Sequence, residues 1–591
     1  MAHANSAPPV FIDFEGIDGS GKTTLSNRLA EFLTAQGIPV HHARSGGIFR
    51  SEISKEIRLL TRDPRFLRMS DVTELLLYVA RDTQMIDEFI RPRLQPGNIV
   101  FSDRYLYSAI AHSHFARRVP RDQVDAVVTT AARNLWPDIV VYSDVDPLTS
   151  RVRKKIQKIR DRRKLGDFGR KGLMGIGFRE EMRNGFLKLA EEDPERWIVI
   201  DNANSTLEVS LQRIFERIAK VLEAKGYPVL KNPGWADLSA VAEHPDSVFA
   251  GDVREVVTIA DEDERRQSAH RVFFDELRRL VDTNPSRAGL HLVGIDTPET
   301  HEIRELIVDR EPEIVSYGLR GVRSPEAMAL RHRLKTIEPR YVARSLSGYS
   351  PEMMELRHEL LKKASNYIAL SVRGSDSEHA WEIRDKVGKK AMREVLISLR
   401  GLDTERAWEL RRKRAKDPHF PAFLESLAGL DTEAAWEWRE QLTAEYLPWV
   451  LMSLRRVFSD RAWDLRAEHI VRAPKIVVKT LGRSNDPRAW ELREQAKVYA
   501  KEVLDSLSGM DNAAAWQLRN DLQKKWPNTA VSSIGASVQS ERAWKFRWAL
   551  LGENPDNLLL LKHIAKAVLR ILHPLDPDLE DDDEDEDEDF T

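Results

Sequence analysis

Residues 10–25 read VFIDFEGIDGSGKTTL, and this stretch decides the fold of the first part of the chain. Gly16 to Thr23 fit the phosphate-binding loop pattern G-x-x-x-x-G-K-[ST] in full. An apolar run precedes the loop and a helical pattern over 25–33 follows it, which is the strand–loop–helix context that the pattern requires. The stretch therefore predicts a nucleotide-phosphate site at the end of a buried strand.

The residue types in this loop match the chemistry of phosphate binding. Glycines let backbone N–H groups curve around phosphate oxygens without a clash from Cβ. Lys22 is expected to reach the β- and γ-phosphates of ATP, and Thr23 to ligate Mg²⁺. The motif alone does not separate motor ATPases, GTPases and small-molecule kinases. The predicted nucleotide-binding residues are Gly16, Asp18, Gly19, Ser20, Gly21, Lys22, Thr23 and Thr24.

Up to residue 227, short β-type runs alternate with helical patterns. The clearest runs are 10–14, 99–101, 139–142 and 197–200. Such alternation predicts an α/β domain in which helices cover a parallel sheet.

Beyond this domain, one sequence unit recurs about every 27 residues. Seven tryptophans stand 26 to 28 residues apart, and His301, Met328 and Met354 continue the series upstream. Each is followed three residues later by an arginine, and most are preceded ten residues earlier by Ser or Thr. Glycine and aspartate between the columns can end one helix and cap the next, so each unit is predicted to be two short helices. About ten such pairs should stack into an α-solenoid. The tryptophans are Trp381, Trp408, Trp436, Trp463, Trp490, Trp516 and Trp544.

The recurrent tryptophans and the recurrent arginines, here called the tryptophan column and the arginine column, have different expected roles. An invariant spacing is typical of a repeated core position, so we expect the tryptophans to fill the core rather than to stack on a ligand. We expect the arginines to form ion-pair ladders with acids of neighbouring repeats, and a binding face is the alternative. The acids expected in these ladders are Glu409, Glu437, Asp464 and Glu491.

Four segments are therefore expected. Residues 1–227 form the α/β domain, and 228–289 form a linker with the first irregular helices. Residues 290–573 form the solenoid, with 558–572 as its cap, and 574–591 form a disordered acidic tail.

Composition excludes several classes of function. The chain has no cysteine, which rules out disulfides, thiolate zinc sites and cysteine nucleophiles, and suits the cytoplasm. No run reaches the ~20 apolar residues that a membrane helix needs. The net charge of −3 conceals a basic body, because the twelve acids between Asp576 and Asp589 leave +9 for the rest. No clustered basic–aromatic motif appears, so nucleic-acid binding is not expected.

Residues 11–24 resemble the opening of bacterial thymidylate kinases. Three later segments resemble that family in the same order: 102–105 followed by Ser108, then 144–147, then 183–187. The resemblance covers residues 10 to 222. It implies a P-loop nucleoside-monophosphate kinase with a five-stranded parallel sheet, which transfers a phosphoryl group from Mg-ATP to dTMP. It also implies a homodimer.

The resemblance also implies roles for individual residues. Lys22, Asp103 and Arg104 would be catalytic, with Thr23 and Asp103 at the metal. A basic, glycine-rich segment over 151–183 would be a lid that closes over ATP, and its candidate catalytic residues are Arg162, Arg163 and Arg170. The acceptor nucleotide would contact Asp18, Arg44, Leu77, Tyr78, Arg81, Arg104, Ser108, Ala109 and His112.

The chain departs from the family pattern at the base pocket. Leu77 stands where the family has a stacking Phe, with Tyr78 beside it, and Ala109 and His112 replace a polar and an aromatic residue. Either Tyr78 substitutes as the stacking residue, or the acceptor is not dTMP. The favoured function is dTMP kinase with a solenoid that binds a protein partner. The alternative is a nucleotide-dependent switch or scaffold with weak turnover, whose function lies in the repeats.

Overall fold

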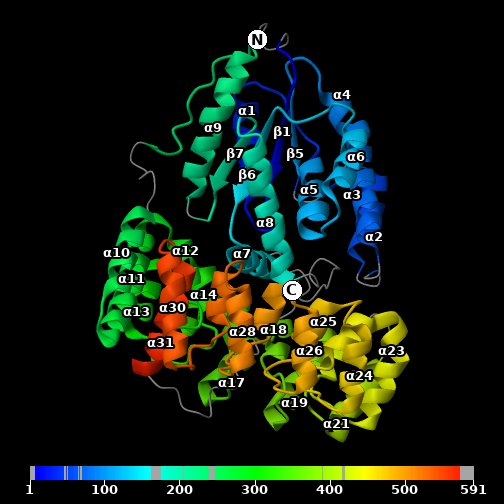
Figure 1. The fold of residues 1–591 in the computed structure, drawn as a ribbon, viewed down its shortest axis with the longest axis vertical. Helices are drawn as coiled ribbons and strands as arrows, with labels where there is room; N and C mark the ends of the chain where they lie inside the picture. Colours follow the sequence, from blue (N-terminus) through cyan, green and yellow to red (C-terminus); the bar gives the residue numbers. More distant parts are fainter. Residues whose placement is uncertain are drawn as a thin grey trace. The chain divides into compact units, whose positions relative to one another are not determined.

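The computed structural model describes residues 7–45, 48–49, 51–63, 66, 69–160, 175–203, 205–238, 246–388, 390–415 and 419–572. The chain forms two compact units whose boundary falls near residue 243. Both units are drawn in Figure 1. Among the described residues, no helix is both long and apolar enough to cross a membrane.

The first unit is built on a parallel five-stranded sheet, as predicted. Its strand order is β2-β5-β1-β6-β7, and β3 and β4 form a separate antiparallel pair. The four predicted runs are confirmed as β1, β5, β6 and β7. The strands are β1 (Val10–Glu15), β2 (Val40–His42), β3 (Arg44–Ser45), β4 (Ile48–Phe49), β5 (Ile99–Asp103), β6 (Ile139–Asp144) and β7 (Trp197–Asp201).

Helices cover both faces of this sheet (Figure 1). Successive side chains of a strand point to opposite faces, so Val10, Ile12 and Phe14 pack against α1 and α9, whereas Phe11 packs with α3, α5, α6 and α8. The helices are α1 (Lys22–Ala35), α2 (Glu52–Arg62), α3 (Asp71–Met85), α4 (Arg91–Arg93), α5 (Leu106–Ile110), α6 (Arg121–Ala132), α7 (Pro147–Arg160), α8 (Gly175–Glu192) and α9 (Leu207–Ala224), with π-helical turns at Ile86–Ile90 and Ala111–Ala116.

The second unit is helical throughout its described residues. Ten helices carry the tryptophan column and its upstream counterparts: α13 (Pro298–Ile307), α15 (Pro325–Leu334), α17 (Pro351–Leu360), α19 (Glu378–Val387), α21 (Glu405–Arg414), α23 (Glu433–Met452), α24 (Asp460–His469), α26 (Pro487–Gln495), α28 (Ala513–Leu522) and α30 (Glu541–Glu553). The remaining helices are α10 (Asp246–Thr258), α11 (Glu262–Thr283), α12 (Pro285–His291), α14 (Pro312–Gly318), α16 (Pro339–Ser345), α18 (Ser365–Leu370), α20 (Met392–Ser398), α22 (Phe420–Ser426), α25 (Pro474–Lys479), α27 (Ala500–Asp505), α29 (Pro527–Ser532) and α31 (Leu558–Leu572).

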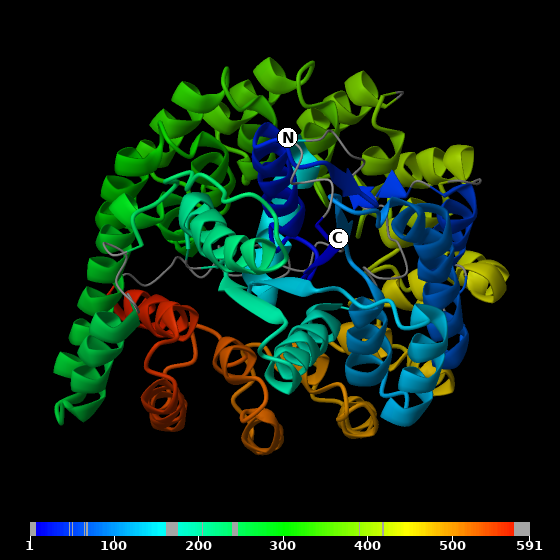
Figure 2. The same cartoon turned by 90° about the horizontal axis from the view of Figure 1, so that it is seen from above.

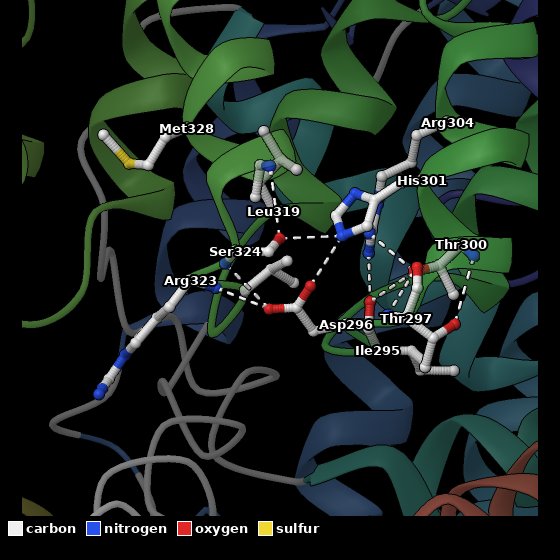
Figure 3. Close-up of polar contacts among 12 residues, drawn as sticks. Ile295, Asp296, Thr297, Thr300, His301, Arg304, Leu319, Arg323, Ser324 and Met328 are labelled. Carbon is white, nitrogen blue, oxygen red and sulfur yellow. Dashed lines mark hydrogen bonds and ion pairs between the residues drawn. The ribbon is translucent and has the colours of Figure 1, made fainter. Parts of the chain in front are cut away.

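The tryptophan column is a core column, as expected. Six of the seven rings are buried, and Trp490 is half-buried. Most indole N–H groups donate to a side chain five residues earlier, such as Trp408 Nε1 to Asp403 at 2.6 Å. In the first repeat, His301 takes the place of the tryptophan and bonds Asp296 in the same way (Figure 3).

The role predicted for the arginine column is wrong. All ten of its arginines are buried and bond to main-chain carbonyls instead of to the acids of neighbouring repeats. Arg411 is typical: its guanidinium donates to the carbonyls of Leu399, Leu402 and Ser426, at 2.7 to 2.9 Å, and to the Ser426 hydroxyl at 3.0 Å. Leu399 and Ser426 lie at the C-terminal ends of α20 and α22, where helix dipoles favour a cation.

Ion pairs between neighbouring repeats do exist, but they are formed by arginines that lie two residues before the tryptophan column. Arg406, two residues before Trp408, lies over the Trp381 ring at 4.4 Å from its centroid. It also pairs with Asp385 of that preceding repeat at 3.2 Å. Arg461 pairs with Glu440 in the same way, at 2.6 Å. The expected charge pairing is therefore present on the surface, while the predicted column lies inside.

The repeats form the predicted stack of two-helix units, and the two ends of this stack meet, so that it closes into a ring. Residues 246–283 are two regular helices, α10 and α11, which pack against α30 and α31 at the other end of the repeats (Figure 2). Trp548 Nε1 donates to Glu262 Oε1 at 2.9 Å, and the Arg266 guanidinium lies 4.4 Å from the centre of the Trp544 ring. Closure gives the apolar faces of the first and last repeats a partner, which an open stack leaves to capping helices.

One polar group in the ring resembles a catalytic triad without its geometry. His301 Nε2 lies 2.8 Å from Asp296 and 2.9 Å from the Ser324 hydroxyl, so a single ring nitrogen faces both side chains (Figure 3). A working triad holds the acid and the nucleophile on different nitrogens. Ser324 also accepts the Ala327 N–H as the N-cap of α15. The group therefore joins two repeats.

Candidate active site

The phosphate-binding loop connects β1 to α1 and is held in a conformation that only glycine fits. Gly16, Gly19 and Gly21 have φ values of 146°, 89° and 92°. A Cβ on Gly16 would lie 2.6 Å from the Ser143 carbonyl oxygen, and one on Gly19 would lie 2.6 Å from that of Ser150. A residue with a side chain at these positions would have a strained backbone, and at Gly16 and Gly19 its Cβ would also clash with a carbonyl oxygen.

Three residues that the sequence analysis did not identify fix the loop from behind. Ser143 Oγ donates to the Ser20 carbonyl at 2.6 Å, and Asn202 Nδ2 donates to the same oxygen at 2.5 Å. Ser150, on α7, donates to the Asp18 carbonyl at 2.5 Å. These bonds engage loop carbonyls, so that the N–H groups are left to face a phosphate.

The two residues predicted to hold a metal lie side by side. The Thr23 hydroxyl donates to Asp103 Oδ2 at 2.6 Å, and Lys22 Nζ is 4.0 Å from Asp103 Oδ1. Thr23 lies in the first turn of α1, and Asp103 ends β5, the neighbour of β1. A hydroxyl beside a carboxylate is a set of hard oxygen donors that fits Mg²⁺. Thr24, the next residue, is exposed.

Arg104 is the centre of a buried polar network at this edge of the sheet. It has a φ of 82°, which is rare for a residue with a side chain. Its guanidinium donates to Asp18 at 2.7 Å and to Ser108 Oγ at 3.1 Å, and it lies 3.7 Å from Glu15. Although burial alone would lower it, Asp18 and Glu15 raise the pKa of Arg104, so the residue stays charged.

Glu15 orients this network and was not predicted. It ends β1, accepts the N–H groups of Tyr105 and Ser108 at 3.1 and 3.0 Å, and accepts the Ser108 hydroxyl at 2.7 Å. A carboxylate so bonded holds the turn after β5 in place. That turn carries Arg104 and Ser108.

A pocket beside the phosphate loop brings together most of the residues predicted to bind the acceptor. It is lined by Asp18, Arg58, Thr61, Arg62, Tyr78, Arg81, Arg104, Ser108, Ala109, His112 and Met182. Leu77 is half-buried and does not line it. Arg44 lies at the start of β3. Arg162, Arg163 and Arg170 lie outside the described residues.

The pocket has the charge of an anion site. Four arginines and one carboxylate line it, and Arg81 is held by two bonds of 2.7 Å to Asp82. Arg58 and Arg62 come from α2 and were not predicted. Their spacing of four residues places them on one helix face, which is the signal in the sequence that could have identified them.

Aromatic rings form the other wall of the pocket. The Tyr78 and His112 rings meet edge to face with centroids 4.6 Å apart, and the Arg81 guanidinium lies 4.9 Å from the Tyr78 centroid. His112 Nε2 is 3.6 Å from Glu74. The pocket therefore places aromatic rings next to cations, a combination that suits a planar base attached to a phosphate.

The base of the predicted lid is anchored to the same sheet. Arg183 on α8 donates to both carboxylate oxygens of Asp144 at 2.7 and 2.8 Å. Asp146 accepts the Thr149 N–H in the first turn of α7. Residues 144–147 therefore contact α7 and α8, which carry the two ends of the predicted lid segment 151–183.

Comparisons with known proteins identify the family of the first unit. A family model described as thymidylate kinase matches residues 14–214. A thymidylate kinase of Geobacillus sp. is 36% identical over 199 residues, which are 34% of this chain and 91% of that protein. One of Oceanobacillus iheyensis is 35% identical, covering 36% of this chain and 92% of its own, and one of Exiguobacterium sibiricum is 37% identical, covering 34% and 90%. The chain belongs to the thymidylate kinase family and is a nucleoside-monophosphate kinase.

Proposed function

We propose that this chain transfers the γ-phosphoryl group of Mg-ATP to dTMP, forming dTDP and ADP. The observation that carries the proposal is the acceptor pocket, in which arginines and the Tyr78 ring lie directly beside the phosphate loop. Relatives named thymidylate kinase support dTMP as the acceptor. Tyr78 supplies the aromatic face that Leu77 does not.

The chain's own residues supply positioning and charge. The loop N–H groups and Lys22 hold the donor phosphates, while Arg104 and Arg81 hold the acceptor with its phosphate towards the loop. Thr23 and Asp103 are the residues that would hold Mg²⁺, which supplies charge neutralisation on the transferred group when it is bound. Charge from Lys22 and Arg104 stabilises the transition state, and no covalent nucleophile is needed.

For the helical ring, we propose a role in binding a protein partner. Stacked repeats present long continuous surfaces that commonly bind proteins. The homodimer that the family resemblance implies is also a proposal.

The acceptor is tested by measuring ADP release from Mg-ATP with dTMP, dUMP, dGMP, dCMP and dAMP. We expect dTMP to give the highest kcat/KM, and Lys22→Ala to lower turnover by about 10²-fold or more, because Lys22 neutralises phosphate charge. If another monophosphate gives the highest value, the pocket has a different specificity. ATP binding without stimulation by any acceptor would instead favour the switch or scaffold function.

The adjacent pair Tyr78 and Leu77 tests the aromatic wall. Tyr78→Ala is expected to raise KM for the best acceptor about tenfold or more, since base–aromatic stacking contributes about 1–3 kcal/mol. Leu77→Ala is the matched control, because Leu77 neighbours Tyr78 on α3 but does not line the pocket. Steady-state kinetics at saturating ATP measure both variants. A larger KM effect from Leu77→Ala would place the base against Leu77 instead.

A further inference from the structure

Neighbouring repeats of the ring are joined by a recurrent surface rung. A residue two positions before the tryptophan column faces one four positions after the column in the preceding repeat. In two rungs the pair is an arginine with an acid, Arg406 with Asp385 and Arg461 with Glu440. At these positions opposite charges hold adjacent helices together, each pair contributing up to about 1 kcal/mol.

Between α17 and α19, the same rung holds two histidines. His379 lies two residues before Trp381, and His358 lies four residues after Met354. Their ring centroids are 4.9 Å apart with planes at 76°. Two imidazoles cannot form an ion pair, so this rung lacks the attraction that joins Arg406 to Asp385.

A carboxylate completes a group of three at this rung. Glu382 stands three residues after His379 on α19, so both side chains share one face of the helix. Its Oε2 atom is 4.0 Å from His358 Nε2. One ligand atom from each of the three residues lies within 4.8 Å of the other two. Among the described residues, this is the one group of three or more such side chains so placed.

The state of each side chain suits metal binding. His379 Nε2 is buried and has no hydrogen-bond partner among the described residues. Burial, followed by the neighbouring His358, lowers the pKa of His379, which favours the neutral ring that ligates metals. The other carboxylate oxygen of Glu382, Oε1, accepts a hydrogen bond from Lys386 Nζ. A bond from the second oxygen of a metal-binding carboxylate fixes its orientation.

We propose that His358, His379 and Glu382 bind a first-row divalent cation, with Zn²⁺ as the preferred ion, and that this ion joins two adjacent repeats. Two imidazoles and one carboxylate are a common protein ligand set for zinc and leave the fourth tetrahedral position open to water. Bonds of ~2.0–2.1 Å bring tetrahedral ligand atoms to about 3.3 Å from one another. His358 and Glu382 are exposed, so rotation of their side chains can shorten the distances between the three ligand atoms to this value.

The test is zinc binding to the full chain, measured by competition with a chromogenic chelator. Excess Mg²⁺ is included to occupy the oxygen donors of the phosphate site, which prefer a hard cation. We expect one zinc ion per wild-type chain and a Kd raised about 100-fold or more in His358→Gln, because a direct ligand is lost. His332→Gln is the matched control, because His332 stands four residues after Met328 at the same helix position, one repeat earlier, and is also exposed.

A second measurement reports the ligands directly. Co²⁺ in a site with histidine and carboxylate ligands gives visible absorption bands whose intensity reports a tetrahedral geometry. We expect these bands in the wild type and in His332→Gln, and their loss in His379→Gln. Absence of zinc binding from the wild type, or equal zinc affinity in His358→Gln and His332→Gln, would overturn the proposal. Circular dichroism of each variant distinguishes loss of a ligand from loss of fold.

Discussion

Arg104→Ala is expected to lower kcat/KM for the acceptor about 10³-fold, which is the range for removal of an arginine that stabilises a transferring phosphoryl group. The guanidinium lies in the acceptor pocket, donates to Asp18 and Ser108, and keeps its charge because Asp18 and Glu15 raise its pKa. Alanine removes both the cation and the bond that fixes Asp18. Steady-state ADP release with varied acceptor at saturating ATP measures the effect.

Two further variants separate chemistry from backbone strain. Arg118→Ala is the matched control, because Arg118 also has a positive φ, of 63°, but does not line the pocket. We expect it to keep the wild-type kcat/KM. Arg104→Lys keeps the charge but loses the two-point contact, and should fall between the other two. A loss in Arg118→Ala as large as that in Arg104→Ala would contradict a role for Arg104 in holding the acceptor.

Much of the kinase site could be predicted because its residues belong to contiguous motifs. The spacing of Gly16 to Thr23 encodes the loop, and Asp103 and Arg104 follow directly at the end of a buried strand. Arg58 and Met182 could not be predicted in this way. They reach the pocket from α2 and α8, and their approach depends on how these helices pack on the sheet. Contiguous patterns identify phosphate residues, whereas the acceptor pocket depends on tertiary contacts.

In the helical unit, too, local sequence patterns predicted some features, whereas features that depend on tertiary contacts were missed. The tryptophan period predicted a core column, because a constant spacing follows from a repeated contact. Ring closure depends on contacts such as Trp548 with Glu262, which lie 286 residues apart and leave no local pattern. The arginine column was misinterpreted because charged residues are rarely buried without an acid. Most partners of these arginines are backbone carbonyls, which no sequence pattern displays. The recurrent Ser/Thr position supplies a further acceptor, as Ser426 does for Arg411.

Arg411→Met is therefore expected to destabilise the ring strongly, by about 3 kcal/mol or more, because the carbonyls of Leu399, Leu402 and Ser426 lose the guanidinium donor. The Leu399 carbonyl still accepts the Leu402 N–H. Methionine fills a similar volume, so the loss reports the hydrogen bonds and the charge rather than a cavity. At neutral pH the arginine is protonated, since burial lowers its pKa only to about 10. Its charge is balanced by the C-terminal ends of α20 and α22 rather than by a paired acid.

Arg406→Met supplies the matched comparison on the same helix. Arg406 is exposed and makes the surface rung with Asp385, so its loss should cost less than about 1 kcal/mol. Urea unfolding followed by tryptophan fluorescence measures both, because the tryptophan column lies in the ring. Equal midpoints for the two variants would mean that the buried carbonyls find other donors. A large gap would mean that the buried Arg411, bonded to the carbonyls at the ends of α20 and α22, stabilises the ring far more than the surface rung does.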